Sequence, residues 1–293
     1  MVFKEPQVRI NKLYAPWDTT HFGPAMRAKY KLDDYSPHNR KAKEQPVVVF
    51  GCYGRGTKVD VMNHRGLCVI VWSGSDSTRL HEVPEFVAHL RANTHRVFHI
   101  AHSHWIQTDL AYWGIPYIDR VVFPVNLSGY KFEPKTGNGV YHYGTKQREW
   151  YYGTHLMKKL RKVWDKRPNM PNIHITAYNA YGKEELYELY KECFIGVRLT
   201  EHDNMALSCV ELGLMGRRSI FNGNIPCAIH YGKYYTSYNP ETRRQWVYQD
   251  ESLMGKVGQM ILEADREPSK ALAEEMREFV HDTEDWLDTK FYE

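Results

Sequence analysis

Short runs of apolar residues alternate along this chain with segments whose apolar residues recur at helical spacing. In the first half, the runs lie at 47–51, 67–72, 96–101 and 120–125, and helices are predicted between them at 57–64, 83–93 and 105–113. A strand that is apolar at every position is buried on both faces, which is typical of a parallel sheet covered by helices. The alternation therefore predicts an α/β fold.

The alternation starts again after a loop rich in glycine and proline at 133–139. Further strands are predicted at 139–144, 172–178, 194–199 and 218–222, with helices at 151–165, 183–193 and 205–215 and a helical tail from Ser252. The stretch up to Pro46 is expected to hold little regular structure. We predict two Rossmann-like domains facing each other across a cleft, over residues 1–135 and 136–269.

The charge of the chain is unevenly spread. The whole chain carries +4, but the first 262 residues hold 35 basic and 24 acidic side chains, a balance of +11. Basic residues gather within 27–43 and 158–167. Such a balance suits an anionic ligand, which could be a nucleotide, a phosphate-bearing sugar or a nucleic acid. The alternative is an ordinary solvated basic surface.

Several classes of protein are disfavoured by what the sequence lacks. The five cysteines are odd in number and show no metal-ligand spacing, which argues against a disulfide framework and a cysteine zinc site. There is no apolar run of about 20 residues for a membrane span and no secretory leader pattern at the N-terminus. We find no P-loop, G-x-S-x-G or kinase motif. A cytoplasmic protein is expected, in the host cytoplasm if it is viral.

The segment 198–216 is the most informative for chemistry. A strand is predicted to end near Leu199 and a helix to begin near Asn204, where free N–H groups can hold a phosphate. Glu211 follows Asp203 by eight residues, about two helical turns, and an acid there could accept the two hydroxyls of a ribose. A simple Asp cap before an amphipathic helix is the alternative interpretation.

This segment resembles the donor-binding segment of retaining GT-B glycosyltransferases of the family-4 type, which carries Glu-x7-Glu. Asp203 matches the first acid and Glu211 the second, with Asn204 and Met205 in positions that line the donor site. The resemblance implies that Asp203 lies beside the donor sugar as a catalytic residue and that Glu211 binds the ribose. Two departures are the Asp at the first position and the loss of both glycines between the acids.

The resemblance also implies basic residues that hold the donor diphosphate at the start of the second domain. The Lys-Gly pair typical of the family is Tyr152-Gly153 here, so Lys146, Arg148 or Arg198 could supply the charge instead. Each of them could equally be a surface charge. The C-terminal helix within 270–293 would pack back onto the first domain, as it does in GT-B enzymes.

Three loops of the first domain are further candidates. Gly54 lies in a glycine-rich turn after the first strand, where a flexible turn without a ligand is the alternative. The turn Trp72–Asp76 is similar to one that lines the cleft in the family, which makes Gly74 a donor contact and Asp76 a catalytic candidate. An ordinary turn between strand and helix with an Asp cap is the alternative there. His102 follows the third strand and could contact donor or acceptor. No third ligand is spaced to complete a metal site with His102 and His104, so no metal is predicted.

The sequence thus predicts a metal-independent, retaining glycosyltransferase that uses a UDP-sugar as its donor substrate and needs no cofactor. The donor would bind the second domain and the acceptor the first. In its compact size, basic charge balance and abundant aromatic residues, the chain resembles the phage enzymes that place glucose or arabinose on 5-hydroxymethylcytosine. The acceptor is therefore predicted to be double-stranded DNA. The alternatives are a transferase of cell-surface glycans, a UDP-sugar 2-epimerase, and a non-enzymatic nucleic-acid-binding protein with a GT-B core.

Overall fold

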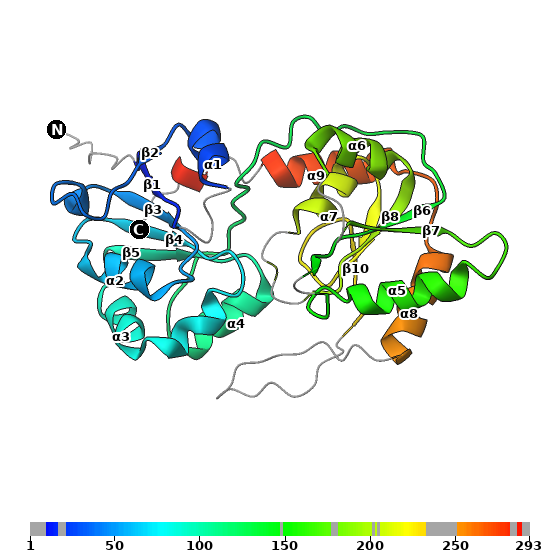
Figure 1. Cartoon of the computed structure of the whole chain (residues 1–293). Helices are drawn as coiled ribbons and strands as arrows, with labels where there is room; N and C mark the ends of the chain where they lie inside the picture. The colour runs from blue at the N-terminus through cyan, green and yellow to red at the C-terminus, as the bar shows by residue number, and fades with distance from the viewer. Residues whose placement is uncertain are drawn as a thin grey trace. The chain divides into compact units, whose positions relative to one another are not determined.

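The structure is a computed structural model, and it describes residues 10–16, 22–146, 149–176, 181–200, 203, 206–232, 251–281 and 286–288. The chain divides into two compact units. Unit 1 comprises residues 1–126, 202–205 and 280–293, and unit 2 comprises residues 127–201 and 206–279. Each unit is built on one five-stranded sheet in which every pair of neighbouring strands is parallel (Figure 1).

The sheet of unit 1 has the strand order β2-β1-β3-β4-β5. Its strands are β1 (Lys12–Tyr14), β2 (Asp33–Asp34), β3 (Val47–Phe50), β4 (Cys68–Val71) and β5 (Val97–Ile100). The helices are α1 (Gly23–Tyr30), α2 (Arg55–Asn63), α3 (Pro84–Ala92) and α4 (His104–Tyr112), with short 3-10 turns η2 (Ala42–Glu44) and η3 (Ser77–Glu82). Strands β3, β4 and β5 confirm the first three apolar runs of the sequence.

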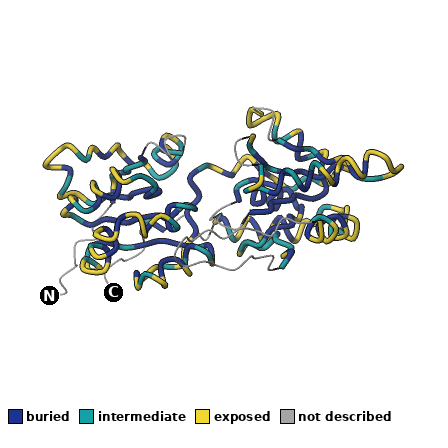
Figure 2. The backbone as a smooth tube through the Cα atoms, turned by 60° about the horizontal axis from the view of Figure 1, so that its bottom comes forward, coloured by how far each residue is buried: buried dark blue, intermediate teal, exposed yellow. Residues whose placement is uncertain are grey.

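Both faces of this sheet are covered, as continuous apolar strands require. In β3, Val47 and Val49 belong to one core cluster, whereas Val48 and Phe50 belong to the other. This alternation places successive side chains on opposite faces of the sheet. Figure 2 shows buried residues in the middle of each unit and exposed residues mainly toward the outside of the unit. The predicted α/β class is therefore confirmed.

Two expectations for unit 1 are wrong. The predicted strand at 120–125 joins no ladder, and only Ile118 forms an isolated bridge, to Ile100. Within this segment Pro124 has no backbone N–H to donate to a ladder, while Val122 and Phe123 are still buried. The N-terminal stretch, expected to be irregular, supplies α1, β1 and β2.

The sheet of unit 2 has the strand order β10-β9-β8-β6-β7. Its strands are β6 (Gly139–His142), β7 (Asn172–Ile175), β8 (Cys193–Val197), β9 (Arg218–Ile220) and β10 (Ala228–Ile229). The helices are α5 (Thr154–Trp164), α6 (Lys183–Lys191), α7 (Leu207–Leu214), α8 (Glu251–Glu263) and α9 (Lys270–His281). A short turn η6 (Trp286–Asp288) lies near the end of the chain, where Trp286 is buried against Tyr30 of unit 1, with ring centroids 5.7 Å apart.

Helix α7 lies very close to the sheet of unit 2. A Cβ atom on Gly196 of β8 would stand 2.6 Å from Cδ1 of Leu212 in α7 and 2.6 Å from Oγ of Ser219 in β9, so a larger residue would require both side chains to shift. The close approach fixes α7, which carries Glu211, against the middle of the sheet. No helix within the described residues is long and apolar enough to cross a membrane.

Candidate functional site

The candidate residues lie in loops and helices that follow the carboxyl ends of parallel strands. This edge is where α/β sheets bind their ligands, because loops from neighbouring strands converge there. Arg198 follows β8, Lys146 follows β6, and Glu211 lies on the helix after β8. In unit 1, Asp76 and His102 follow β4 and β5. The predicted residues therefore form two groups, one in each unit.

Glu211 of unit 2 is a buried carboxyl group held by two phenols. Its side chain belongs to α7, and the residue is 9% exposed. The hydroxyl of Tyr190 donates to Oε2 at 2.7 Å, and Tyr130 also hydrogen-bonds the carboxyl group. Burial raises the pKa of Glu211, whereas the two phenols lower it by stabilising the carboxylate. The group is thereby oriented before any ligand binds.

The tyrosines around Glu211 are functional candidates that the sequence did not reveal. The rings of Tyr141 and Tyr190 meet edge to face at 4.8 Å, and Tyr130 lies 6.3 Å from Tyr190. These residues come from β6, α6 and the segment before β6. No local spacing connects them to Glu211, because the contacts span from 21 to 81 positions of the chain. An abundance of tyrosine was the sole signal.

Arg198 is a buried cation beside two aromatic rings. The residue is 8% exposed, and its backbone N–H donates to the carbonyl of Ile220 in β9. The guanidinium carbon lies 4.2 Å from the ring centroid of Tyr143 and 4.8 Å from that of Tyr152. The two rings stand 5.1 Å apart and nearly perpendicular, at 88°. Arg198 therefore occupies the corner between two tyrosines.

The remaining predicted residues of the donor segment are less well defined. Lys146 is exposed in the turn after β6, and Asp203 is half-buried. Arg148, Asn204 and Met205 lie outside the described residues. Arg198 and Glu211 are thus the two predicted donor-binding side chains whose surroundings the structure describes in detail.

In unit 1, Asp76 connects two loops. It is 0% exposed, and its carboxyl group accepts hydrogen bonds from the backbone N–H groups of Cys52, Ser73, Gly74 and Ser77 at 2.9 to 3.3 Å. Burial raises the pKa of Asp76 to about 6, while these backbone donors lower it. The geometry gives Asp76 a positioning role, because its oxygens are directed at the backbone of the loops after β3 and β4.

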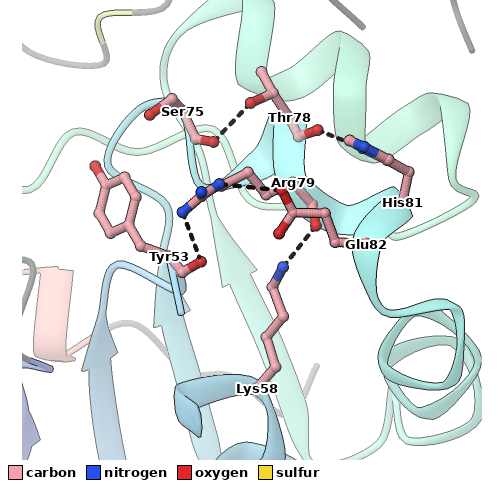
Figure 3. Close-up of polar contacts among 7 residues, drawn as sticks. All are labelled: Tyr53, Lys58, Ser75, Thr78, Arg79, His81 and Glu82. Atoms are coloured by element: carbon pink, nitrogen blue, oxygen red, sulfur yellow. Dashed lines mark hydrogen bonds and ion pairs between the residues drawn. The ribbon is translucent and has the colours of Figure 1, made fainter. Parts of the chain in front are cut away.

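The same two loops are joined by a second set of contacts (Figure 3). The buried side chain of Lys58, at 0% exposure, donates to the carbonyl of Arg79 at 2.6 Å. Arg79 in turn donates to the carbonyl of Tyr53 at 3.4 Å and forms an ion pair with Glu82. Gly54 precedes α2 in this cross-linked region, with an extended backbone. Side-chain hydrogen bonds therefore connect the segments that follow β3 and β4.

His102 forms a pair with a carboxylate that the sequence did not indicate. Its Nδ1 atom lies 3.0 Å from Oδ1 of Asp119, and the histidine side chain is 14% exposed. Asp119 follows the bridge residue Ile118, so the irregular segment after α4 places it beside β5. A carboxylate on Nδ1 orients the imidazole ring. Within the described residues, no group of three or more His, Cys, Asp or Glu side chains is arranged to hold a metal ion.

Comparisons with known proteins identify the fold. No protein-family model matches the chain, and no curated protein matches it in sequence. Solved structures do match it. HepE from Anabaena, in complex with UDP and glucose, gives a TM-score of 0.53 at 10% identity and covers 94% of this chain and 95% of its own.

Two further structures agree with this match. TarM from S. aureus gives a TM-score of 0.52 at 12% identity over 84% of this chain and 54% of its own, so the chain spans about half of TarM. Sucrose-phosphate synthase from Thermosynechococcus elongatus gives 0.50 at 10% identity, over 90% of this chain and 72% of its own. Together with the two parallel sheets, these matches show a Rossmann-like GT-B fold.

Proposed function

We propose that this protein transfers a sugar from a UDP-sugar to a hydroxyl group. The observation that carries the proposal is Glu211, a buried carboxylate that Tyr190 and Tyr130 hold on α7, the helix that follows β8. Its oxygens would accept the two hydroxyls of the donor ribose. HepE, which shares the fold, is seen with UDP and glucose.

The cationic groups of unit 2 would stabilise the leaving diphosphate. Arg198 is the best placed, with Lys146 and Arg148 as further candidates, and electrostatic stabilisation of this kind can replace a metal ion. Asp203 would lie beside the donor sugar. In the retaining reaction, the bond from the anomeric carbon to the phosphate oxygen breaks, the acceptor oxygen attacks from the same face, and its proton passes to the departing phosphate.

For the acceptor we propose 5-hydroxymethylcytosine in double-stranded DNA, with glucose or arabinose as the sugar. The support is electrostatic, because the first 262 residues carry +11 and a polyanion favours a basic partner. Unit 1 would contact the acceptor through the loops that Asp76 organises and through His102. All five cysteines are buried free thiols, which is typical of a reducing compartment such as the cytoplasm.

A UDP-release assay tests the class and the acceptor together. The protein is incubated with a panel of UDP-sugars, with unmodified DNA, with hydroxymethylated DNA, or without DNA. We expect UDP release that depends on the hydroxymethylated DNA, with the matching mass gain on that base. Release without any effect of DNA would replace the DNA acceptor with a glycan. DNA binding without affinity for any sugar nucleotide would replace the enzyme with a binding protein.

A matched pair of variants tests the site. Glu211→Gln removes the charge that would accept the ribose hydroxyls, and we expect UDP affinity to fall about 10- to 100-fold, since hydrogen bonds to charged groups contribute roughly 1.5–3 kcal/mol. Glu188→Gln is the control, because Glu188 is exposed and pairs only with Lys191 among the contacts described for it. Equal UDP affinity in both variants would remove Glu211 from the donor site.

A further inference from the structure

The surroundings of Arg198 point to a role for two tyrosines that rests on the proposed function. We propose that Tyr143 and Tyr152 are positioning residues that hold the guanidinium of Arg198 so that it can bind the diphosphate of the donor. The evidence is the corner geometry, with the guanidinium carbon 4.2 Å and 4.8 Å from the two ring centroids.

The pairing of β6 with β8 in the parallel sheet places Tyr143 beside Arg198. His142 of β6 is directly paired with Val197 of β8. The next residue on each strand is therefore Tyr143 on one and Arg198 on the other, side by side at the carboxyl edge. Because strand register fixes this neighbourhood, the contact between Tyr143 and Arg198 does not depend on how a long loop folds.

The second ring, that of Tyr152, comes from the loop before α5. Tyr152 precedes Gly153, which has a left-handed backbone, with φ of 69°, at the first turn of the helix. A Cβ atom on Gly153 would lie 2.8 Å from the side chain of Leu199, the residue after Arg198. Glycine thus allows the loop to lie directly against the β8 terminus, which brings the ring of Tyr152 next to the guanidinium.

Aromatic rings are suited to hold a cation that must still bind an anion. The negative face of a ring attracts a guanidinium without carrying a net charge. A carboxylate partner, by contrast, would cancel much of the charge. Two perpendicular rings restrain the guanidinium in two directions, while the planar fork of N–H donors suits the oxygens of a phosphate. Burial at 8% exposure strengthens both interactions.

The competing interpretation is that the tyrosines stack on the base of the nucleotide. The two interpretations differ in which ligand should bind more weakly when the rings are removed. If the rings hold Arg198 for the diphosphate, their removal weakens binding of UDP but leaves uridine unaffected. If the rings stack on the base, binding of UDP and of uridine weakens by the same factor.

Calorimetric titration of UDP and uridine into the full-length protein tests the proposal. The variants are Arg198→Gln, Tyr143→Leu and Tyr152→Leu, with Tyr143→Phe and Tyr152→Phe as controls that keep each ring. We expect each Leu variant to weaken UDP binding about 5- to 30-fold, the size of a desolvated cation–π contact, with uridine unchanged. In the Arg198→Gln background, Tyr152→Leu should have no further effect on UDP.

A graded substitution covers the case in which a Leu variant does not fold, as judged by its melting curve. Phenylalanine with increasing ring fluorination at position 152 keeps the shape of the side chain and weakens the negative face. Stepwise loss of UDP affinity would support the proposal.

Three outcomes would overturn it: unchanged UDP affinity in the Leu variants, no response to fluorination, or equal losses for UDP and uridine. In all three the wild type still binds UDP, so the proposed function survives. A wild-type protein that binds no UDP overturns both.

Discussion

At the scale of single residues, the described site is organised by buried polar groups rather than by exposed ones. Asp76, Lys58, Glu211 and Arg198 are all at most 9% exposed. A buried polar or charged group is costly unless it has partners, and the partners found here are backbone donors, carbonyls, phenols and rings. These groups therefore fix the loops and side chains around them in place.

Asp76 offers a direct measure of this cost. Asp76→Ala leaves the buried N–H groups of Cys52 and Gly74 without their acceptor. We expect the free energy of unfolding to fall by about 2–4 kcal/mol, since each unsatisfied buried donor costs roughly 1–3 kcal/mol. Urea unfolding measures the change. Asp76→Asn, which keeps one acceptor oxygen, should lose less, and equal losses would contradict the positioning role.

His142 predicts a dependence of stability on pH. It is 0% exposed, with ring nitrogens 3.2 Å from the carbonyl oxygen of Val197 and 3.1 Å from the hydroxyl of Thr154. Burial lowers its pKa to about 3 from the ordinary histidine value of 6.5. Between these values the unfolded chain binds a proton and the folded one does not. The free energy of unfolding therefore falls as pH drops below 6.5, by up to about 1.4 kcal/mol per pH unit.

The variant His142→Gln isolates this contribution. It should unfold with a smaller loss of stability between about pH 6.5 and about pH 4.5 than the wild type does, because one titrating group is gone. Some dependence remains, since burial also lowers the pKa of His99 to about 3. Chemical unfolding at a series of pH values provides the comparison. Parallel pH profiles for the two proteins would show that His142 is not buried neutral.

At the scale of elements, two glycines are expected to respond in opposite ways to substitution by alanine. Gly153 has a left-handed backbone and a close neighbour, whereas Gly255 lies inside a helix with free space around it. Gly153→Ala adds a Cβ atom at a left-handed residue, against Leu199. We expect stability to fall by about 1–2 kcal/mol from the backbone alone, with weaker UDP binding because Tyr152 shifts.

Gly255→Ala in α8 is the matched control for Gly153→Ala. Nothing lies within 4 Å of a Cβ atom at Gly255, so alanine should raise stability by about 0.5–1 kcal/mol. Thermal and urea unfolding report both changes. A stabilised Gly153→Ala protein would show that the loop before α5 is not held in this conformation.

The elements that are best predicted from the sequence are strands in which every residue is apolar or small, because such strands are buried at every position. Strands β3, β4 and β8 are apolar or small throughout and buried throughout, so their pattern is unambiguous. The segment 120–125 contains a similar apolar run that is equally buried at Val122 and Phe123, but it joins no ladder, and Pro124 has no backbone N–H to donate. Burial can be predicted from such a run, whereas strand pairing depends on backbone donors as well.

The surroundings of the site were less predictable. Glu211 and Arg198 stand out because their segment has a recognisable spacing. The contacts with Tyr130, Tyr190, Tyr143 and Tyr152 could not be predicted, because they join residues far apart in the chain through strand register and helix packing. The contact between His102 and Asp119 could not be predicted for the same reason, because an irregular segment brings the carboxylate of Asp119 to β5.

At the scale of the whole molecule, the end of the chain belongs to the core of the unit where the chain begins. Trp286 is 0% exposed and packs with Leu13, Val48 and Val69 in one cluster. Trp286→Ala should lower the free energy of unfolding by about 3–5 kcal/mol, the usual cost of removing a large buried side chain.

The control for Trp286→Ala is Leu262→Ala. Leu262 is 46% exposed on α8, and its loss should change stability little. Circular dichroism during urea unfolding gives both values. Equal stability of the two variants would show that Trp286 contributes nothing to this core.

This placement of Trp286 has a consequence for the order of synthesis. A growing chain completes β1 to β5 before the strands of unit 2, yet the core on one face of that first sheet includes Trp286, which is translated after α9. The described core residues around the sheet of unit 2 all precede Trp286, as do its strands and α5 to α9. Unit 2 can therefore finish folding before unit 1, although the strands of unit 1 come first in the sequence.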